Sequence, residues 1–157
     1  MAVEFKRILH PTDFSELSLH ALKYARELAD TFSAQLYCLH VIDESYQYWS
    51  AMGPEMAPVT PPVEDLTSMA QGQMERFADE HLVGMKFAPI SAVASGKPFA
   101  EIARYARENS IDLIVLATHG RGGLTHVLLG STAEKVVRKA PCPVLTVRDP
   151  QHEFQMP

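Results

Sequence analysis

The sequence predicts an α/β fold in which a five-stranded parallel sheet lies between two layers of helices, a doubly wound three-layer sandwich. Short apolar segments of strand character alternate with segments whose apolar residues recur at helical spacing. Strands that alternate with helices are joined by right-handed crossovers, which makes the sheet mostly parallel. Residues 111–116 are almost continuously apolar, as expected of a strand covered on both faces.

The first half of the chain predicts a strand, a helix, a second strand and a long loop. A short apolar strand within residues 6–12 stops at a proline, and residues 35–42 form a second apolar, strand-like segment. The helix expected between them has an apolar face made of Leu17, Ala21, Leu22, Ala25, Leu28, Ala29 and Phe32. Residues 43–64 contain four prolines and no clear period, so we expect a long loop there.

The second half continues the alternation. Helical spacing resumes with Val63, Leu66, Ala70, Met74, Phe77 and Ala78, and a third strand is expected near residues 87–94. Pro98 suits the first turn of the next helix, because its missing N–H group costs nothing there. The fourth strand, a helix and the fifth strand follow at residues 111–116, about 131–140 and 141–147. We expect a single domain over residues 1–157 with a loose tail at 149–157.

Composition and charge exclude several classes of protein. The chain has 157 residues, 46% of them hydrophobic, and a net charge of −5 without a basic stripe, so no nucleic-acid partner is expected. No segment is apolar enough to span a bilayer or to serve as a signal peptide, so we expect a cytoplasmic protein with no membrane partner. Cys38 and Cys142 lie in apolar segments without CxxC spacing, which favours buried free thiols.

A glycine-rich segment, ATHGRGGLTHVLLGST at residues 117–132, joins the fourth strand to the last helix. Ligands of doubly wound sheets bind at the carboxyl ends of strands, where this segment lies. Glycines at 120, 122 and 123 allow positive φ and close approach of the backbone to a ligand. Ser131 and Glu134 read as a capping box, and a helix N-terminus favours an anion such as phosphate. Thr132 adds a hydroxyl and Arg121 a cation; the alternative is a mobile connection that merely begins a helix.

The standard nucleotide-binding signatures are missing from the sequence. A Walker-type loop requires a lysine before its Ser or Thr, and Gly130-Ser131-Thr132 is not preceded by one in that arrangement. The segment beginning at Gly120 does not form GxGxxG, and the turn after the first strand has no glycine at all. These absences argue against a dinucleotide cofactor and against a GTPase.

A second polar segment, His10-Pro11-Thr12-Asp13, follows the first strand. If the first and fourth strands are neighbours, this segment faces the glycine-rich one. Asp13 is either the N-cap of the following helix, with Glu16 completing a capping box, or a contact for a metal or a ribose hydroxyl. His10 and the strand residue His40 are expected to be packed, and the remaining histidines lack the spacing of a metal site.

Together these segments resemble the ATP-binding subclass of the universal stress protein family. Its signature is G-x2-G-x9-G-[ST], which Gly120, Gly130 and Ser131 match in its second, third and fourth elements. The first glycine is replaced by Ala117, and if that position requires positive φ the alanine would cost roughly 1 kcal/mol. The segments RILHPTDFSELSLHALKYA and AEKVVRKAPCPVLTV are also similar to the family, so the resemblance covers nearly the whole chain.

The resemblance implies a Rossmann-like fold of the adenine nucleotide α-hydrolase type and an ATP site. In the family, an acidic residue at the position of Asp13 lies near the adenosine and engages Mg²⁺ or Mn²⁺ through the phosphates. The other positions carried over are Pro11 and Thr12 beside it, Val41 against adenine, and Ala117, Gly120, Gly130, Ser131 and Thr132 around the phosphates. The family also forms homodimers through the last strand, here residues 143–147.

The leading hypothesis is therefore a stress or signalling protein that ATP switches between conformations. We expect slow hydrolysis at most, because no base for water and no arginine finger beyond Arg121 is evident. The alternative is a dimeric interaction module of the same fold that binds no nucleotide; an enzyme acting on a small phosphorylated substrate lacks a catalytic constellation. The loop at 43–64, with Tyr46, Tyr48 and Trp49, either covers the nucleotide or widens the dimer contact.

Overall fold

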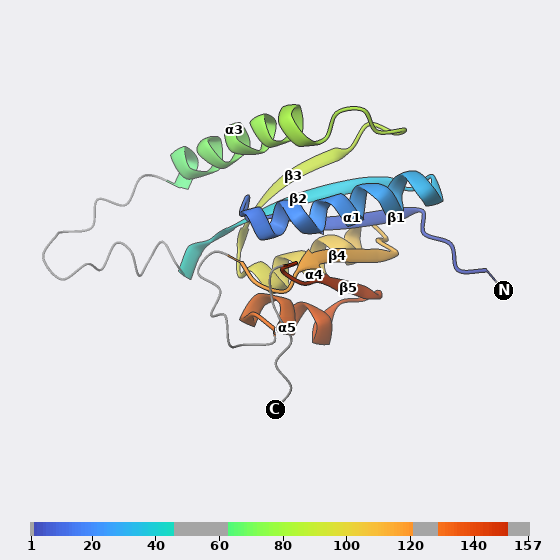
Figure 1. Ribbon diagram of the computed structural model, residues 1–157. Helices are drawn as coiled ribbons and strands as arrows, with labels where there is room; N and C mark the ends of the chain where they lie inside the picture. Colours follow the sequence, from blue (N-terminus) through green and yellow to red (C-terminus); the bar gives the residue numbers. More distant parts are fainter. Residues whose placement is uncertain (1, 46–62, 121–128, 151–157) are drawn as a thin grey trace, which may run out of the picture.

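The computed structural model describes residues 2–45, 63–120 and 129–150, and Figure 1 shows their arrangement. Most of the expected long loop, including Tyr46, Tyr48 and Trp49, lies outside the described residues. So do Arg121, the glycines at 122 and 123, and most of the expected tail.

The secondary structure follows the predicted alternation of strands and helices. In chain order the elements are β1 (Arg7–Pro11), α1 (Glu16–Phe32), β2 (Gln35–Asp43), α3 (Val63–His81), β3 (Ile90–Gly96), α4 (Pro98–Glu108), β4 (Leu113–Ala117), α5 (Ser131–Lys139) and β5 (Val144–Val147). Some strand boundaries differ from expectation. β4 covers Leu113–Ala117 rather than 111–116, β3 begins and ends later than residues 87–94, and β5 begins at Val144 rather than at residue 141. A proline, Pro89 or Pro143, immediately precedes β3 and β5, and a proline has no N–H group for the ladder.

The five strands form one parallel sheet in the order β3-β2-β1-β4-β5 (Figure 1). The chain moves outward from β1 through β2 to β3, then crosses to β4 on the other side of β1. The direction of winding therefore reverses between β1 and β4, and the predicted doubly wound α/β class is confirmed. In this class of fold the reversal point opens a crevice at the carboxyl ends of the strands.

The core has two halves, one on each face of the sheet. Ile8, Cys38 and Val115 pack with residues of α1 and α3, while their strand neighbours Leu9 and Leu39 pack with α4 and α5. Successive strand residues point to opposite faces, so a strand that is apolar at every position fills both halves. This explains the nearly unbroken apolar run in β4.

The two cysteines differ in their surroundings, although both are free thiols. Cys38 is completely buried in the first half of the core, as expected, and burial raises the pKa of its thiol to about 12. Cys142 is only half-buried, so the expectation of a buried thiol is wrong for this residue.

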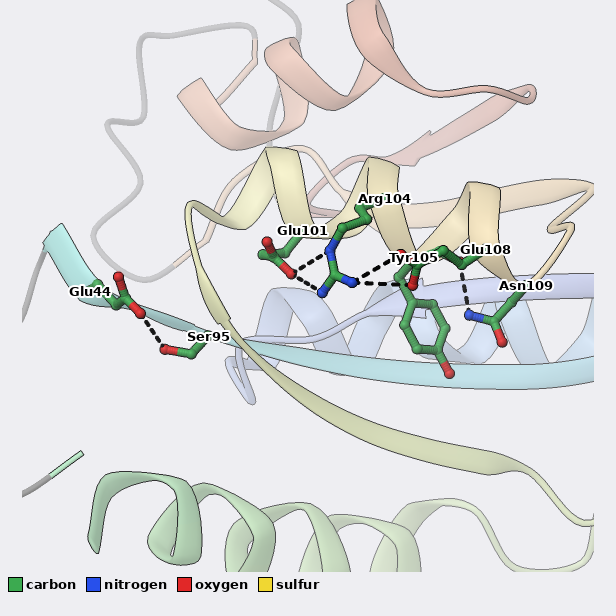
Figure 2. Close-up of polar contacts among 7 residues, drawn as sticks. All are labelled: Glu44, Ser95, Glu101, Arg104, Tyr105, Glu108 and Asn109. Carbon is green, nitrogen blue, oxygen red and sulfur yellow. Dashed lines mark hydrogen bonds and ion pairs between the residues drawn. The ribbon is translucent and has the colours of Figure 1, made fainter. Parts of the chain in front are cut away.

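Polar contacts hold the carboxyl ends of β2 and β3 together beside α4 (Figure 2). The Ser95 hydroxyl donates a hydrogen bond of 2.9 Å to the carboxylate of Glu44.

On α4, the guanidinium of Arg104 pairs with Glu101 and with Glu108, one turn away on either side. Exposed pairs of this kind add little stability individually, so the apolar face of α4 is what secures it to the sheet.

Candidate functional site

A cleft of about 760 Å³ lies at the carboxyl ends of β1, β2 and β4. This is the winding reversal of the sheet, and the volume falls within the range of roughly 300–1,000 Å³ that is typical of ligand pockets. The candidate residues that line it are Pro11, Thr12, Asp13, Val41, Ala117, Gly120, Gly130, Ser131 and Thr132. Of the residues singled out for binding, Arg121 is the one that lies outside the described residues.

Asp13 and Gly120 meet across the reversal point, because β1 and β4 are adjacent. A Cβ atom placed on Gly120 would lie 2.7 Å from Oδ2 of Asp13. The expectation that glycine is needed here for positive φ is wrong for Gly120, because its φ is not positive. The close approach of the carboxylate is what excludes a side chain at this position.

Ala117 occupies the place where the signature has its first glycine. It is the last residue of β4, in register with Val147 of β5, and its φ is not positive. The condition under which alanine would be strained is therefore not met. The alanine fits the end of a regular strand without cost to the backbone.

The helix after β1 begins later than its capping-box pattern indicated. Ser15, not Asp13, is the N-cap of α1, and its hydroxyl accepts the N–H of Ser18 at 3.2 Å. Oδ1 of Asp13 accepts the N–H of Ser15 at 3.0 Å and also the Ser15 hydroxyl. The capping-box spacing predicted the wrong N-cap because Phe14, which has a left-handed backbone conformation, lies before the start of the helix. Asp13 is left outside the helix, at the wall of the cleft.

The helix after β4 also lacks the expected capping box. Its N-cap is Gly130, and Ser131 is already the first helical residue. The N–H of Gly130 donates to the carbonyl of Thr118 at 2.7 Å, and a Cβ on Gly130 would lie 2.9 Å from that oxygen. Gly130 has no side chain to cap the helix, and no side chain of the described residues takes its place. The first turn of α5 borders the cleft, where its N–H groups and positive dipole end favour an anion.

Two strand histidines support the wall of the cleft. His10 is fully buried, as expected, and its Nδ1 donates to the carbonyl of Val115 at 2.9 Å. Burial lowers the pKa of His10 to about 4, against smaller opposing effects of that hydrogen bond and of Asp13. His40 is half-buried; its Nδ1 donates to the carbonyl of Thr12 at 2.8 Å and it borders the cleft.

The sequence analysis did not predict several of the residues that line the cleft. They are Ser18, Leu39, His40, Ile42, Asp43, Pro98, Ile102, Leu116, Thr118, His119 and Ala133. Asp43 is the last residue of β2 and Thr118 directly follows β4, so the rule that pointed to Asp13 also applies to them. Ser18 belongs to α1, and its hydroxyl donates a hydrogen bond of 2.9 Å to the hydroxyl of Thr12, another residue of the cleft. No sequence spacing indicates that contact.

The described residues contain neither a clustered metal site nor a helix that could span a membrane. No group of three or more His, Cys, Asp or Glu side chains is placed to hold a metal ion within residues 2–45, 63–120 and 129–150. In the same part of the chain, no helix combines the length and the apolar character needed to cross a membrane.

Comparisons with known proteins agree on one family. A model of the Universal stress protein family matches residues 4–148. Universal stress protein MJ0531 of Methanocaldococcus jannaschii is 34% identical over 149 residues, which cover 95% of this chain and 85% of that protein. The solved structure of protein MJ0577 from the same organism has a TM-score of 0.79 at 32% identity, covering 94% of this chain and 98% of that chain.

A further solved structure is a universal stress protein in complex with cAMP. Its TM-score is 0.67, and the match covers 93% of this chain and 98% of that chain. At 19% identity it is a likeness of fold.

The buried imidazole of His10 predicts a loss of stability in mild acid. In the unfolded chain the pKa of His10 is about 6.5, so between pH 6.5 and 4 the unfolded state takes up a proton that the folded state does not. Stability is full above that window and falls through it, by up to about 3 kcal/mol from this residue. Denaturant titrations of the unmodified protein and of His10→Gln between pH 7.5 and 4.5 measure it. A constant difference in unfolding free energy between the two proteins would contradict the prediction.

The Gly130→Ala substitution is expected to destabilise the protein by about 1 kcal/mol or more, because the new methyl group meets the backbone carbonyl of Thr118. Gly72→Ala in α3 is the matched control: open space surrounds Gly72, and alanine stabilises a helix interior by about 1 kcal/mol. Urea denaturation compares the two variants. Equal stabilisation by both would show that Gly130 tolerates a side chain.

Proposed function

This chain belongs to the universal stress protein family, and from that premise we propose that it binds ATP in the cleft at the carboxyl ends of β1, β2 and β4. The observation that carries the proposal is the first turn of α5, which borders the cleft without a side-chain cap among the described residues. A phosphate group would occupy the place of the missing cap. The cAMP complex supports the class of ligand, because cAMP is also an adenine nucleotide and that protein has the same fold.

The lining residues fit the two ends of such a ligand. We assign the phosphates to the N–H groups of α5 together with the hydroxyls of Ser131 and Thr132. Glycine at 120 and 130 keeps the wall of the cleft compact, since an oxygen of Asp13 or of Thr118 lies within 3 Å of where a Cβ atom would be. The adenine would lie against Val41, beside the apolar side chain of Ile102.

Asp13 is the residue we assign to a metal ion. A carboxylate oxygen suits Mg²⁺ or Mn²⁺, and Mg²⁺ in particular is commonly held by one or two carboxylates together with substrate phosphates. Asp13 lines the cleft, and its Oδ2 faces Gly120 there. The ion would therefore sit between this carboxylate and the phosphates, and it would neutralise their charge.

We propose that ATP serves this protein as a conformational ligand, with slow hydrolysis at most. Fast phosphoryl transfer requires a residue that orients the attacking water and a cation that stabilises the transferred group. Arg121 is the candidate cation in the glycine-rich segment, and it lies outside the described residues. A ligand that binds one conformation more tightly shifts the population toward it without being consumed. This is the action we propose in stress signalling.

The Ser131→Asp substitution provides the sharpest test of the phosphate site. A carboxylate on the first helical residue repels phosphates but interacts favourably with the helix dipole, so folding is retained. Isothermal titration calorimetry is expected to show ATP binding by the unmodified protein and binding weaker by about tenfold or more for Ser131→Asp. The control Ser131→Asn has nearly the same shape without the charge, and it should bind ATP within a few-fold of the unmodified protein.

Absence of ATP binding at millimolar concentration, with and without Mg²⁺ or Mn²⁺, would reject the ATP proposal. It would leave the interaction module as the function of this fold. Equal binding by the Asp and Asn variants would place the phosphates elsewhere in the cleft.

We also propose a homodimer formed through residues 143–147. β5 is an edge strand of the sheet, so one side of its backbone is available for pairing. Leu145 in the middle of β5 is 38% exposed, and Val137 on the neighbouring helix α5 is 48% exposed. A second copy paired along this edge would cover Leu145.

Leu145→Lys is expected to shift the protein toward monomer, because a charged side chain on an edge strand opposes pairing with a second strand. Ile90→Lys is the matched control, since Ile90 is 43% exposed on β3, the opposite edge of the sheet. Sedimentation velocity over a range of concentrations distinguishes the two variants. A monomeric unmodified protein, or dissociation caused by Ile90→Lys alone, would refute pairing through β5.

A further inference from the structure

Phe14 has a backbone conformation that bulky residues rarely adopt. Its φ is 63°, in the left-handed region. The other non-glycine residues with positive φ in the described part of the chain are Ser33 and Ser110, which lie just after the ends of α1 and α4. Phe14 instead lies between a strand and a helix, directly after Asp13. Such a conformation persists where the surrounding structure holds it, and it is concentrated at functional sites.

The ring of Phe14 is held by two elements that are distant in sequence. Its centroid lies 4.5 Å from the ring of His40 on β2 and 5.5 Å from the ring of Phe77 on α3. The contact with Phe77 is edge-to-face, and Phe77 is only 5% exposed. The ring therefore joins the turn at the cleft to the buried face of α3.

Hydrogen bonds hold the backbone around Phe14 in the same arrangement. The N–H of Phe14 donates to the Thr12 hydroxyl at 3.1 Å, and His40 donates to the Thr12 carbonyl. The N–H of Thr12 donates to the carbonyl of Leu39 at 2.8 Å. The turn is thus tied to β2 through both backbone and side chains, and the direction of the Asp13 side chain depends on it.

We infer that Phe14 is a positioning residue for the nucleotide, and that through it α3 supports the site. The ring, clamped between His40 and Phe77, keeps the turn left-handed and holds the Asp13 carboxylate against Gly120. No residue of α3 within 63–81 lines the cleft, so a change in α3 alters nucleotide affinity without touching the nucleotide. This inference rests on the proposed binding of ATP.

Two substitutions of Phe14 test the role of the ring. Leucine keeps apolar bulk but loses the ring contacts, and glycine removes the ring while adopting positive φ without strain. Each variant is expected to bind ATP about tenfold more weakly in calorimetry, since a loosely held Asp13 must be ordered on binding. Affinity equal to that of the unmodified protein in a folded Phe14 variant would overturn the inference.

A double-mutant cycle with Asp13→Ala distinguishes positioning from general structural support. Phe14 acts through Asp13, so Phe14→Leu is expected to weaken ATP binding in the unmodified background and to change it little once Asp13 is alanine. An equal loss in both backgrounds would show that Phe14 merely supports the fold, and it would refute the positioning role.

The contribution of α3 is tested by Phe77→Leu, which removes the ring that contacts Phe14. We expect ATP binding to weaken several-fold. Phe5→Leu is the matched control, because Phe5 packs against the same half of the core and forms another edge-to-face pair, with Phe32, but lies before the start of β1. Thermal unfolding reports the stability lost by each variant, and the control should lose stability without losing affinity.

The outcomes separate the two proposals. Absence of ATP binding by the unmodified protein would refute both the ATP site and the positioning role of Phe14. ATP binding by the unmodified protein together with unchanged affinity in the Phe14 and Phe77 variants removes only the positioning role.

Discussion

The parallel pairing of β1 with β4 is the constraint on which the remaining structure depends. It places the reversal of winding in the middle of the sheet and brings two segments about a hundred residues apart to one edge. As a result Asp13 lies against Gly120, and the first turn of α5 lines the same cleft. A different neighbour for β1 would separate these residues, although every helix and strand could still form.

Both glycines of the cleft are explained by an oxygen atom that lies within 3 Å of where a Cβ atom would be. The usual argument for glycine is conformational, yet neither Gly120 nor Gly130 has positive φ. At Gly130 the restriction is a carbonyl oxygen that the N–H of the same residue must reach. At Gly120 it is a carboxylate held in place by the neighbouring turn. The conformational strain is found instead at Phe14, a residue that the signature does not include.

Much of the fold and the outline of the cleft could be predicted from the sequence, because both follow from short-range periodicity and one topological rule. The apolar run of β4 and the polar residues after β1 needed no knowledge of distant contacts. The starts of α1 and α5 could not be predicted in the same way. Each contains an acidic residue at capping-box spacing, but the true start is set by the left-handed turn at Phe14 and by the bond from Gly130 to Thr118. Ser18 escaped for a similar reason, since its contact with Thr12 exists only after α1 has packed on the sheet.

The N-terminus of α5, which no side chain of the described residues caps, has a consequence for the lifetime of the protein. Helix ends without a cap leave N–H groups that only water or a ligand can satisfy, so an anion bound there stabilises the folded state in proportion to the logarithm of its concentration. Local opening of this helix would become rarer as the anion accumulates, and a protease would find the chain less often exposed. The abundance of the protein would then follow the supply of its ligand, even if no partner ever sensed the bound conformation.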